Sequence, residues 1–190
     1  MTLEDDITLY HGSYTEIDSV DLSKCLRGKD FGKGFYLTTS KDQAVSFIKT
    51  SLLKAKGDKR ILDSQNYGYV TEFKFTIKED AACYEFDSVN TDWLYFICMN
   101  RRQSLSEILR PNLKDDFDKY DIVVGKIAND DTNATLDAFL SGTFGNVIDK
   151  RAVDFVISLL MPERLSDQVC FKTAKSLTCL EKVGATRHDI

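Results

Sequence analysis

The order of apolar and polar residues predicts short strands and helices that follow one another irregularly along the chain. Residues 69–77 alternate with a period of two, which is typical of a strand. Ala44, Ile48 and Leu52 recur at helical spacing, after a capping-box pattern at 40–43 that predicts where this helix begins. Further strands are predicted at 7–10, 35–38, 82–86, 121–128, 168–171 and 176–180. Further helices are predicted at about 91–103, 133–141 and 148–159. Because no regular βαβ rhythm is present, the pattern favours an α+β fold over a doubly wound sheet.

Composition and charge limit the classes of protein to which this chain can belong. The chain has 190 residues, of which 43% are hydrophobic, and a formal net charge of -5. This length, with no linker rich in Pro, Gly or Ser, predicts a single domain over residues 1–190. The acidic balance argues against a protein that holds nucleic acid by bulk electrostatics. The first residues lack the features of a signal peptide, and the longest apolar run, at 153–161, is too short to span a membrane.

The cysteines and histidines bear on the compartment and on metal binding. There are 5 cysteines, an odd number, and no two of them form a C-x-x-C pair. Reduced thiols in a cytoplasm are the simplest account of this pattern. His11 and His188 lie at opposite ends of the sequence, so no metal site is expected. We therefore expect a cytoplasmic protein without a bound metal and without a membrane partner.

Three short segments stand out by their residue types. The first segment, Tyr-His-Gly-Ser at 10–13, spans the end of a predicted strand and the polar turn predicted at 11–13. Phe-Gly-Lys-Gly-Phe-Tyr at 31–36 enters the next strand, and Asp-Gln-Val-Cys-Phe at 167–171 forms a late strand. Each is weak alone, since a lone histidine or a G-x-G pair is more often structural. In this order they resemble the poly(ADP-ribose) polymerase branch of the ADP-ribosyltransferase superfamily, whose signatures are H-G-S, F-G-K-G-I-Y-F and a late residue, usually Glu. With Asn-Arg at 100–101 and D-x-x-x-G at 121–125, the chain looks similar to an uncharacterised bacterial domain family of that superfamily.

The resemblance implies an ADP-ribosyltransferase-like split β-sheet core with flanking helices, and a site for NAD as co-substrate. By this resemblance His11 bonds the adenosine ribose, the backbone of Gly12 approaches the nicotinamide carboxamide, and Ser13 bonds a ribose hydroxyl. Tyr36 offers a ring on which nicotinamide stacks, because aromatic faces favour the positive pyridinium. Gly34 belongs to the glycine turn that leads to this tyrosine and is included in the cofactor-binding set.

The late motif and the first long helix depart from the family pattern. Gln168 occupies the place of the usual Glu, so it can bond the ribose hydroxyl but cannot supply charge. His11, Tyr36 and Gln168 form the predicted catalytic set. A glutamine at this position favours transfer of a single ADP-ribose. The Gln168→Glu variant is expected to retain or raise activity. Ala44 replaces a serine that binds the carboxamide in the family. Phe47 falls at the position of a second stacking ring, with plain helix core as the alternative.

Three charged residues leave alternatives open at this stage. Arg101 can grip a pyrophosphate bidentately, or it can lie at a solvated helix end that the helix dipole stabilises. Asp130 or Asp131 can supply a carboxylate near the site, or they can cap the helix that follows them.

Four candidate functions remain. The leading hypothesis is an NAD-dependent mono-ADP-ribosyltransferase that cleaves the nicotinamide–ribose bond and transfers ADP-ribose to a macromolecule. A protein acceptor is slightly favoured over nucleic acid by the net charge of -5. Small bacterial members of the superfamily are often toxins or effectors, which implies an antitoxin or immunity partner. The alternatives are an NAD glycohydrolase, an RNA 2′-phosphotransferase of related fold, and a catalytically weak module that binds NAD or ADP-ribose.

Overall fold

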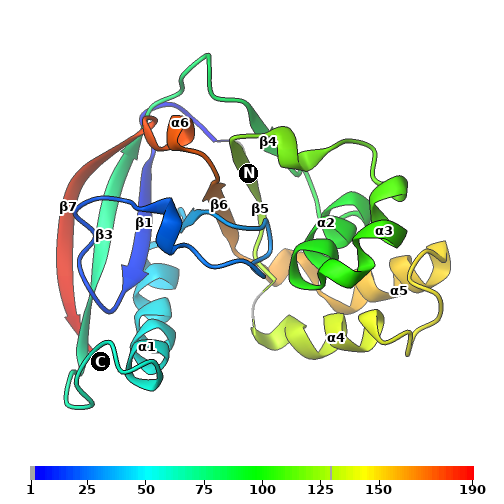
Figure 1. Cartoon of the computed structure of the whole chain (residues 1–190), viewed down its shortest axis with the longest axis horizontal. Helices are drawn as coiled ribbons and strands as arrows, with labels where there is room; N and C mark the ends of the chain where they lie inside the picture. The colour runs from blue at the N-terminus through cyan, green and yellow to red at the C-terminus, as the bar shows by residue number, and fades with distance from the viewer. Residues whose placement is uncertain (1–2, 129) are drawn as a thin grey trace.

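Two β-sheets lie side by side, and a group of helices covers the far side of one of them (Figure 1). The computed structural model describes residues 3–128 and 130–190. The strands are β1 (Thr8–Ser13), β2 (Phe35–Leu37), β3 (Tyr67–Phe75), β4 (Cys83–Glu85), β5 (Ile122–Lys126), β6 (Asp167–Phe171) and β7 (Leu180–Asp189). The helices are α1 (Lys41–Gly57), α2 (Thr91–Arg101), α3 (Ser106–Leu109), α4 (Asp130–Leu140), α5 (Lys150–Leu159) and α6 (Ala174–Leu177). The protein is therefore of the α+β class that the sequence pattern predicts.

Among the described residues, a single backbone bridge joins the two sheets. The first has the strand order β1-β3-β7, with antiparallel neighbours throughout. The second has the order β2-β6-β5-β4, in which only β4 and β5 run parallel to one another. Tyr10 in β1 and Thr38, just after β2, exchange backbone hydrogen bonds of 2.8 and 3.0 Å. This bridge places β2 between β1 and β6 at the junction of the sheets.

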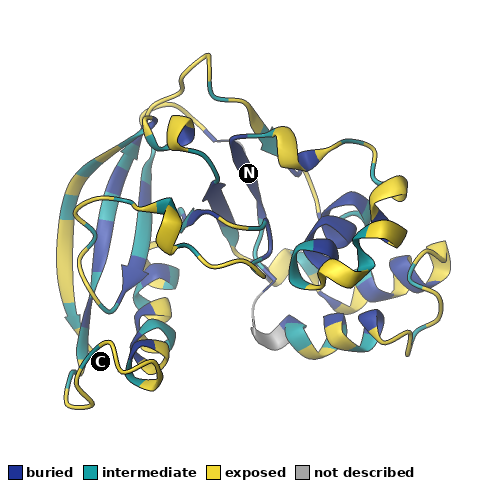
Figure 2. Cartoon of the chain, in the orientation of Figure 1, coloured by how far each residue is buried: buried dark blue, intermediate teal, exposed yellow. Residues whose placement is uncertain are grey.

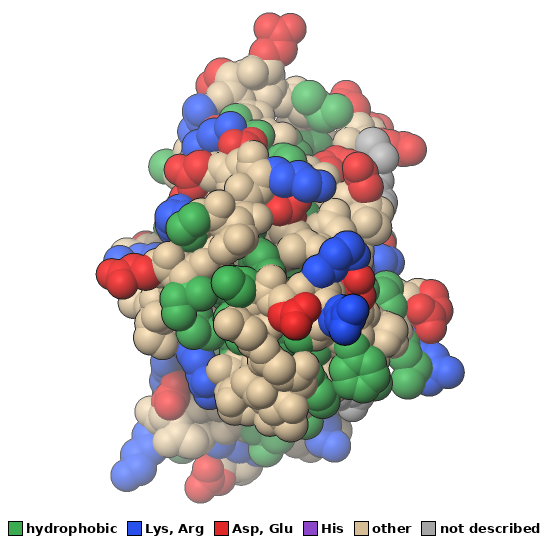
Figure 3. Space-filling view, turned by 90° about the vertical axis from the view of Figure 1, so that its right-hand side faces the viewer, with side chains coloured by type: hydrophobic (Ala, Val, Ile, Leu, Met, Phe, Trp, Pro, Cys, Tyr) green, Lys and Arg blue, Asp and Glu red, His purple; other side chains and the backbone are tan. Residues whose placement is uncertain are grey.

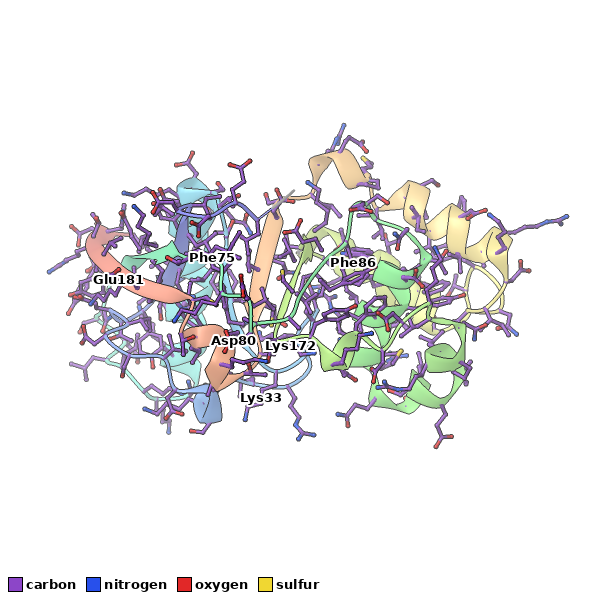
Figure 4. The ribbon with its side chains drawn as sticks, turned by 90° about the horizontal axis from the view of Figure 1, so that it is seen from above. Lys33, Phe75, Asp80, Phe86, Lys172 and Glu181 are labelled. Carbon is purple, nitrogen blue, oxygen red and sulfur yellow. The ribbon has the colours of Figure 1, made fainter. Side chains whose placement is uncertain are left out.

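Apolar side chains fill both sides of the second sheet. Phe75 belongs to a core that both sheets share, whereas Phe86 belongs to a larger core between the second sheet and helices α2, α4 and α5. Seen from above, these two side chains lie on opposite sides of β5 and β6 (Figure 4). A third, smaller cluster joins α1 to the first sheet through Ala44, Ile48 and Val70. Sequestering this apolar surface from water is the main driving force for the fold.

The helix α2 is the most deeply buried helix, as its dark blue ribbon indicates (Figure 2). The side chain of Asn90 accepts a hydrogen bond from the Trp93 backbone at 3.0 Å and so caps the helix N-terminus. The Trp93 indole donates to the Lys126 carbonyl at 3.0 Å and ties the helix to β5. Among the described residues, no helix combines the length and the apolar character needed to cross a bilayer.

Two predicted elements are wrong, for local reasons. Residues 11–13, expected as a polar turn, continue β1 because they pair with residues 69–71 of β3. Residues 176–177, expected in a strand, end the short helix α6, because Thr173 and Ser176 form a reciprocal capping box. The last strand begins at Leu180 and extends to Asp189 along the edge of the first sheet.

The helical side of the molecule presents a mixed surface. Figure 3 shows apolar side chains among acidic and basic ones on this face. Phe155 and Leu159 of α5 are 50% and 40% exposed, whereas Val156 between them is buried. Charges of both signs are interspersed here, so this face does not have the basic character typical of a nucleic-acid site.

Candidate functional site

The predicted catalytic residues lie on three strands at the junction of the sheets. His11 is in β1, Tyr36 in β2 and Gln168 in β6, and β2 pairs directly with β6. Residues 30–34, which we call the 30–34 loop, run immediately before β2. Tyr36 and Gln168 both bond to this loop through their side chains. His11 joins the group differently, through the Tyr36 carbonyl.

The His11 ring is fixed by one hydrogen bond and one ring contact. Its Nδ1 lies 2.8 Å from the Tyr36 carbonyl oxygen, and its ring centroid lies 4.7 Å from that of Phe35. A carbonyl oxygen can only accept, so Nδ1 carries the hydrogen and Nε2 of the neutral ring is an acceptor. Burial lowers the pKa of His11 below 6.5, and the bond to the Tyr36 carbonyl opposes this in part. The folded protein therefore favours the neutral ring over the charged one.

This lowered pKa predicts a pH-dependent stability. As the pH falls through 6.5, the unfolded chain takes up a proton at His11 more readily than the folded protein does, so the free energy of unfolding should fall. Urea unfolding at pH 7.5, 6.5 and 5.5 measures this slope. The His11→Gln variant, which does not titrate, should show a shallower slope than the wild type. Equal slopes would mean that His11 has an ordinary pKa in the folded protein.

The Tyr36 hydroxyl closes the 30–34 loop. It donates to the Gly32 carbonyl at 2.7 Å and accepts from the Phe31 backbone at 3.0 Å. Burial raises the pKa of Tyr36 far above its usual range, and the neighbouring Cys170 thiol raises it further. The hydroxyl is therefore committed to the loop as a neutral phenol, and the half-buried ring packs against the larger core.

Asp30 is the centre of a buried polar network that the sequence analysis did not identify. Its carboxylate, on a residue only 6% exposed, accepts from the backbone of Ala128 at 2.9 Å and from the Gln168 amide at 2.9 Å. It also accepts from Arg101, with Nε at 2.8 Å and a terminal nitrogen at 2.7 Å. Asn100 donates to the Asp30 backbone carbonyl at 3.1 Å. The Asn-Arg pair at the end of α2 thus holds the start of the loop.

The guanidinium of Arg101 has neither of the two predicted environments. Besides Asp30, it donates to Asn133 at 2.6 Å and to the Ala128 carbonyl at 2.5 Å. Its side chain is 21% exposed, so it is not a solvated helix end. With its nitrogens bonded to three groups of the protein, Arg101 supports the 30–34 loop and is not poised to grip a pyrophosphate.

Gln168 is buried, with 4% of its surface exposed, and its side-chain nitrogen has two partners. Nε2 donates to Oδ2 of Asp30 at 2.9 Å and to the Lys126 carbonyl at 3.3 Å. The residue therefore lies beside a carboxylate, although it carries no charge itself. Asp130 and Asp131, the other predicted carboxylates, begin α4 itself and so do not precede the helix they were expected to cap; their side chains are not described.

The glycines of the two motifs are explained by close packing. A Cβ at Gly12 would overlap the carbonyl of Ala44 in α1, and a Cβ at Gly34 would lie 2.5 Å from the Cys170 sulfur. Gly12 thus lets α1 approach β1, and Ala44 is buried against that strand. Gly34 lets β2 approach β6. Both glycines have a packing role, whatever their relation to a ligand.

Two more predicted ligand residues differ in burial. Ser13, the last residue of β1, is buried, with 6% of its surface exposed. Phe47 lies on α1 and is 43% exposed, so the alternative that it belongs to the helix core is wrong. No contact in the structure brings it to the 30–34 loop among the described residues.

Neither of the two described surface hollows lies at this site. One, of about 110 Å³, is lined by residues that include Phe75 and Cys83, and the other, of about 180 Å³, by residues that include Phe73 and Lys182. The candidate site is therefore defined by its polar network and by the strands that meet there. Within residues 3–128 and 130–190, no cluster of three His, Cys, Asp or Glu side chains is placed to hold a metal ion.

The fold and the site together define an α+β protein with two sheets and a buried Asp–Arg–Gln network near their junction. Residues 7–182 match the model of the family described as "Protein of unknown function (DUF3990)", and the chain belongs to this family. The search of curated proteins gives no match.

Proposed function

We propose that the protein is an NAD-dependent mono-ADP-ribosyltransferase. The observation that carries the proposal is the position of His11, Tyr36 and Gln168, which are 25 and more residues apart in sequence but lie on neighbouring strands. Each occupies the place in its motif that the resemblance assigns to it. The two sheets joined at one bridge, with helices on their outer sides, also fit the split sheet that the resemblance implies.

The reaction proposed breaks the bond between the nicotinamide nitrogen and C1 of the ribose. Nicotinamide leaves with the electron pair of that bond, and a nucleophile of the acceptor attacks C1 and releases a proton. His11 orients NAD by accepting a hydrogen bond from a ribose hydroxyl at Nε2, since Nδ1 is committed to the Tyr36 carbonyl. The ring of Tyr36 provides an apolar face for nicotinamide. The acceptor we propose is a macromolecule, with protein favoured.

Binding of NAD can be tested on the purified protein by calorimetry. We expect a dissociation constant between micromolar and millimolar, the usual substrate range. His11→Ala should weaken binding about tenfold, because it removes one hydrogen bond. The matched control is His188→Ala, since His188 lies near the end of β7 and is paired with Gly68. Absence of NAD binding by the folded wild type would contradict the proposal.

A second candidate is a module that binds NAD or ADP-ribose without cleaving it. The observation that favours it is the state of Gln168, whose amide nitrogen is already bonded to Asp30 and to the Lys126 carbonyl. A module of this kind would bind NAD in the calorimeter and release no nicotinamide. An NAD glycohydrolase would release nicotinamide at the same rate with or without an acceptor.

A further inference from the structure

The two partners of the Gln168 side chain determine which way its amide faces. The Asp30 carboxylate and the Lys126 carbonyl both accept hydrogen bonds only, so the atom that lies 2.9 and 3.3 Å from them must be the NH₂ nitrogen. A flipped amide would place its oxygen against two other oxygens. The carbonyl oxygen, Oε1, therefore points away from Asp30.

Asp30 is itself held in place from several directions. Arg101 donates to Oδ1, whereas the Ala128 backbone and Gln168 both donate to Oδ2. The side chain of Asp30 is 8% exposed. Among the described residues, its cationic partner is Arg101, which belongs to the same buried network. Such a charge-assisted network restricts all of its members to one arrangement.

We propose that Asp30 is a positioning residue that fixes the Gln168 amide with Oε1 directed to the substrate. This inference rests on the proposed function. Gln168 then acts as a hydrogen-bond acceptor for a ribose hydroxyl, which is also what a carboxylate at this position would do. Because hydrogen bonds in series polarise one another, the negative charge of Asp30 increases the electron density on Oε1. A neutral glutamine thereby favours positive charge that grows on the ribose.

The kinetic test is the Asp30→Asn variant. The asparagine side chain of this variant can turn its own NH₂ group towards Gln168. Because that group donates, the Gln168 amide is no longer held with its NH₂ towards position 30 and can flip. We expect kcat for nicotinamide release to fall about 100-fold, as for other small misplacements in an active site, while KM for NAD changes less than threefold. An unchanged kcat in a folded variant would overturn the proposal.

The matched control is Asp121→Asn. Asp121 is also a buried carboxylate, 7% exposed, and it accepts from the Ala82 backbone, Thr173 and Lys175 near the other end of β5. This variant should lose stability in the same way and should retain the wild-type kcat. If both variants lose kcat equally, the effect comes from general destabilisation and the positioning role is wrong.

A second measurement needs neither a stable variant nor activity. In the wild type, the side-chain NH₂ of Gln168 should give nuclear magnetic resonance signals that exchange slowly with solvent, compared with those of the exposed Gln103. If the NH₂ groups of Gln168 and Gln103 exchanged equally fast, the claim that Asp30 fixes the orientation of Gln168 would be wrong. Slow exchange in a wild type that releases no nicotinamide would support the orientation and contradict the proposed function, so the two failures are distinguishable.

Discussion

Replacing Arg101 with alanine is expected to lower the free energy of unfolding by about 3–5 kcal/mol. The reason is that the buried Asp30 side chain would be left without its cationic partner. The same change removes the hydrogen bonds from Arg101 to Asn133 and to the Ala128 carbonyl, so α2 would lose part of its connection to the start of α4. Urea unfolding at neutral pH measures the loss.

The adjacent residue provides the control for this prediction. Arg102 carries the same charge, is exposed and follows the last turn of α2. Arg102→Ala should change the unfolding free energy by less than about 1 kcal/mol, as exposed charges usually do. If Arg101→Ala had an equally small effect, Asp30 and Arg101 would not form a buried pair in solution.

Replacing Gln168 with alanine should reduce nicotinamide release about 100-fold, which is the usual cost of one polar group in a transition-state site. It should also destabilise the fold by about 1–3 kcal/mol, because Asp30 and the Lys126 carbonyl each lose a donor. Initial rates at saturating NAD, measured beside unfolding curves, separate these two effects.

The control for this variant is Gln65→Ala. The side chain of Gln65 also donates to two carbonyls, those of Tyr14 and Tyr67, but these lie by the first sheet, away from the 30–34 loop. Its loss should therefore reduce stability and leave the rate unchanged. Equal rates for Gln168→Ala and the wild type would show that Gln168 has no part in the chemistry.

The structure also revises the expectation for a glutamate at position 168. From the sequence, Gln168→Glu should retain or raise activity, because it adds a negative charge beside a developing cation. Asp30, however, lies 2.9 Å from the atom that would become a carboxylate oxygen. Two carboxylates at this distance cannot both ionise without a large penalty. We now expect this variant to be less stable than Gln168→Ala at neutral pH, and to lose activity with it.

Local signals in the sequence predicted several elements well. Ser40 accepts from the Gln43 backbone and begins α1, as its capping pattern predicts, and the alternation around 69–77 falls largely on β3. The strand β7 was missed beyond Leu180, because its residues are mostly polar and half-buried or exposed along a sheet edge. Such an edge strand is specified by its pairing with β3, which a local pattern does not contain.

The site was predicted in part, through motifs and not through contacts. His11, Tyr36 and Gln168 were selected by their places in three motifs, and the fold brings their strands together. Asp30 was missed because its partners Arg101 and Gln168 are 71 and 138 residues away in sequence. No periodicity marks such a network, and a charged residue before a glycine turn is ordinarily exposed.

Release of nicotinamide from NAD by the purified wild type tests the central claim most directly. The account predicts release that is proportional to enzyme concentration and that decreases at least tenfold in His11→Ala. The control variant His188→Ala should retain the wild-type rate. A folded wild type that binds NAD but releases no nicotinamide, with or without candidate protein acceptors, would contradict the claim that this protein is an ADP-ribosyltransferase.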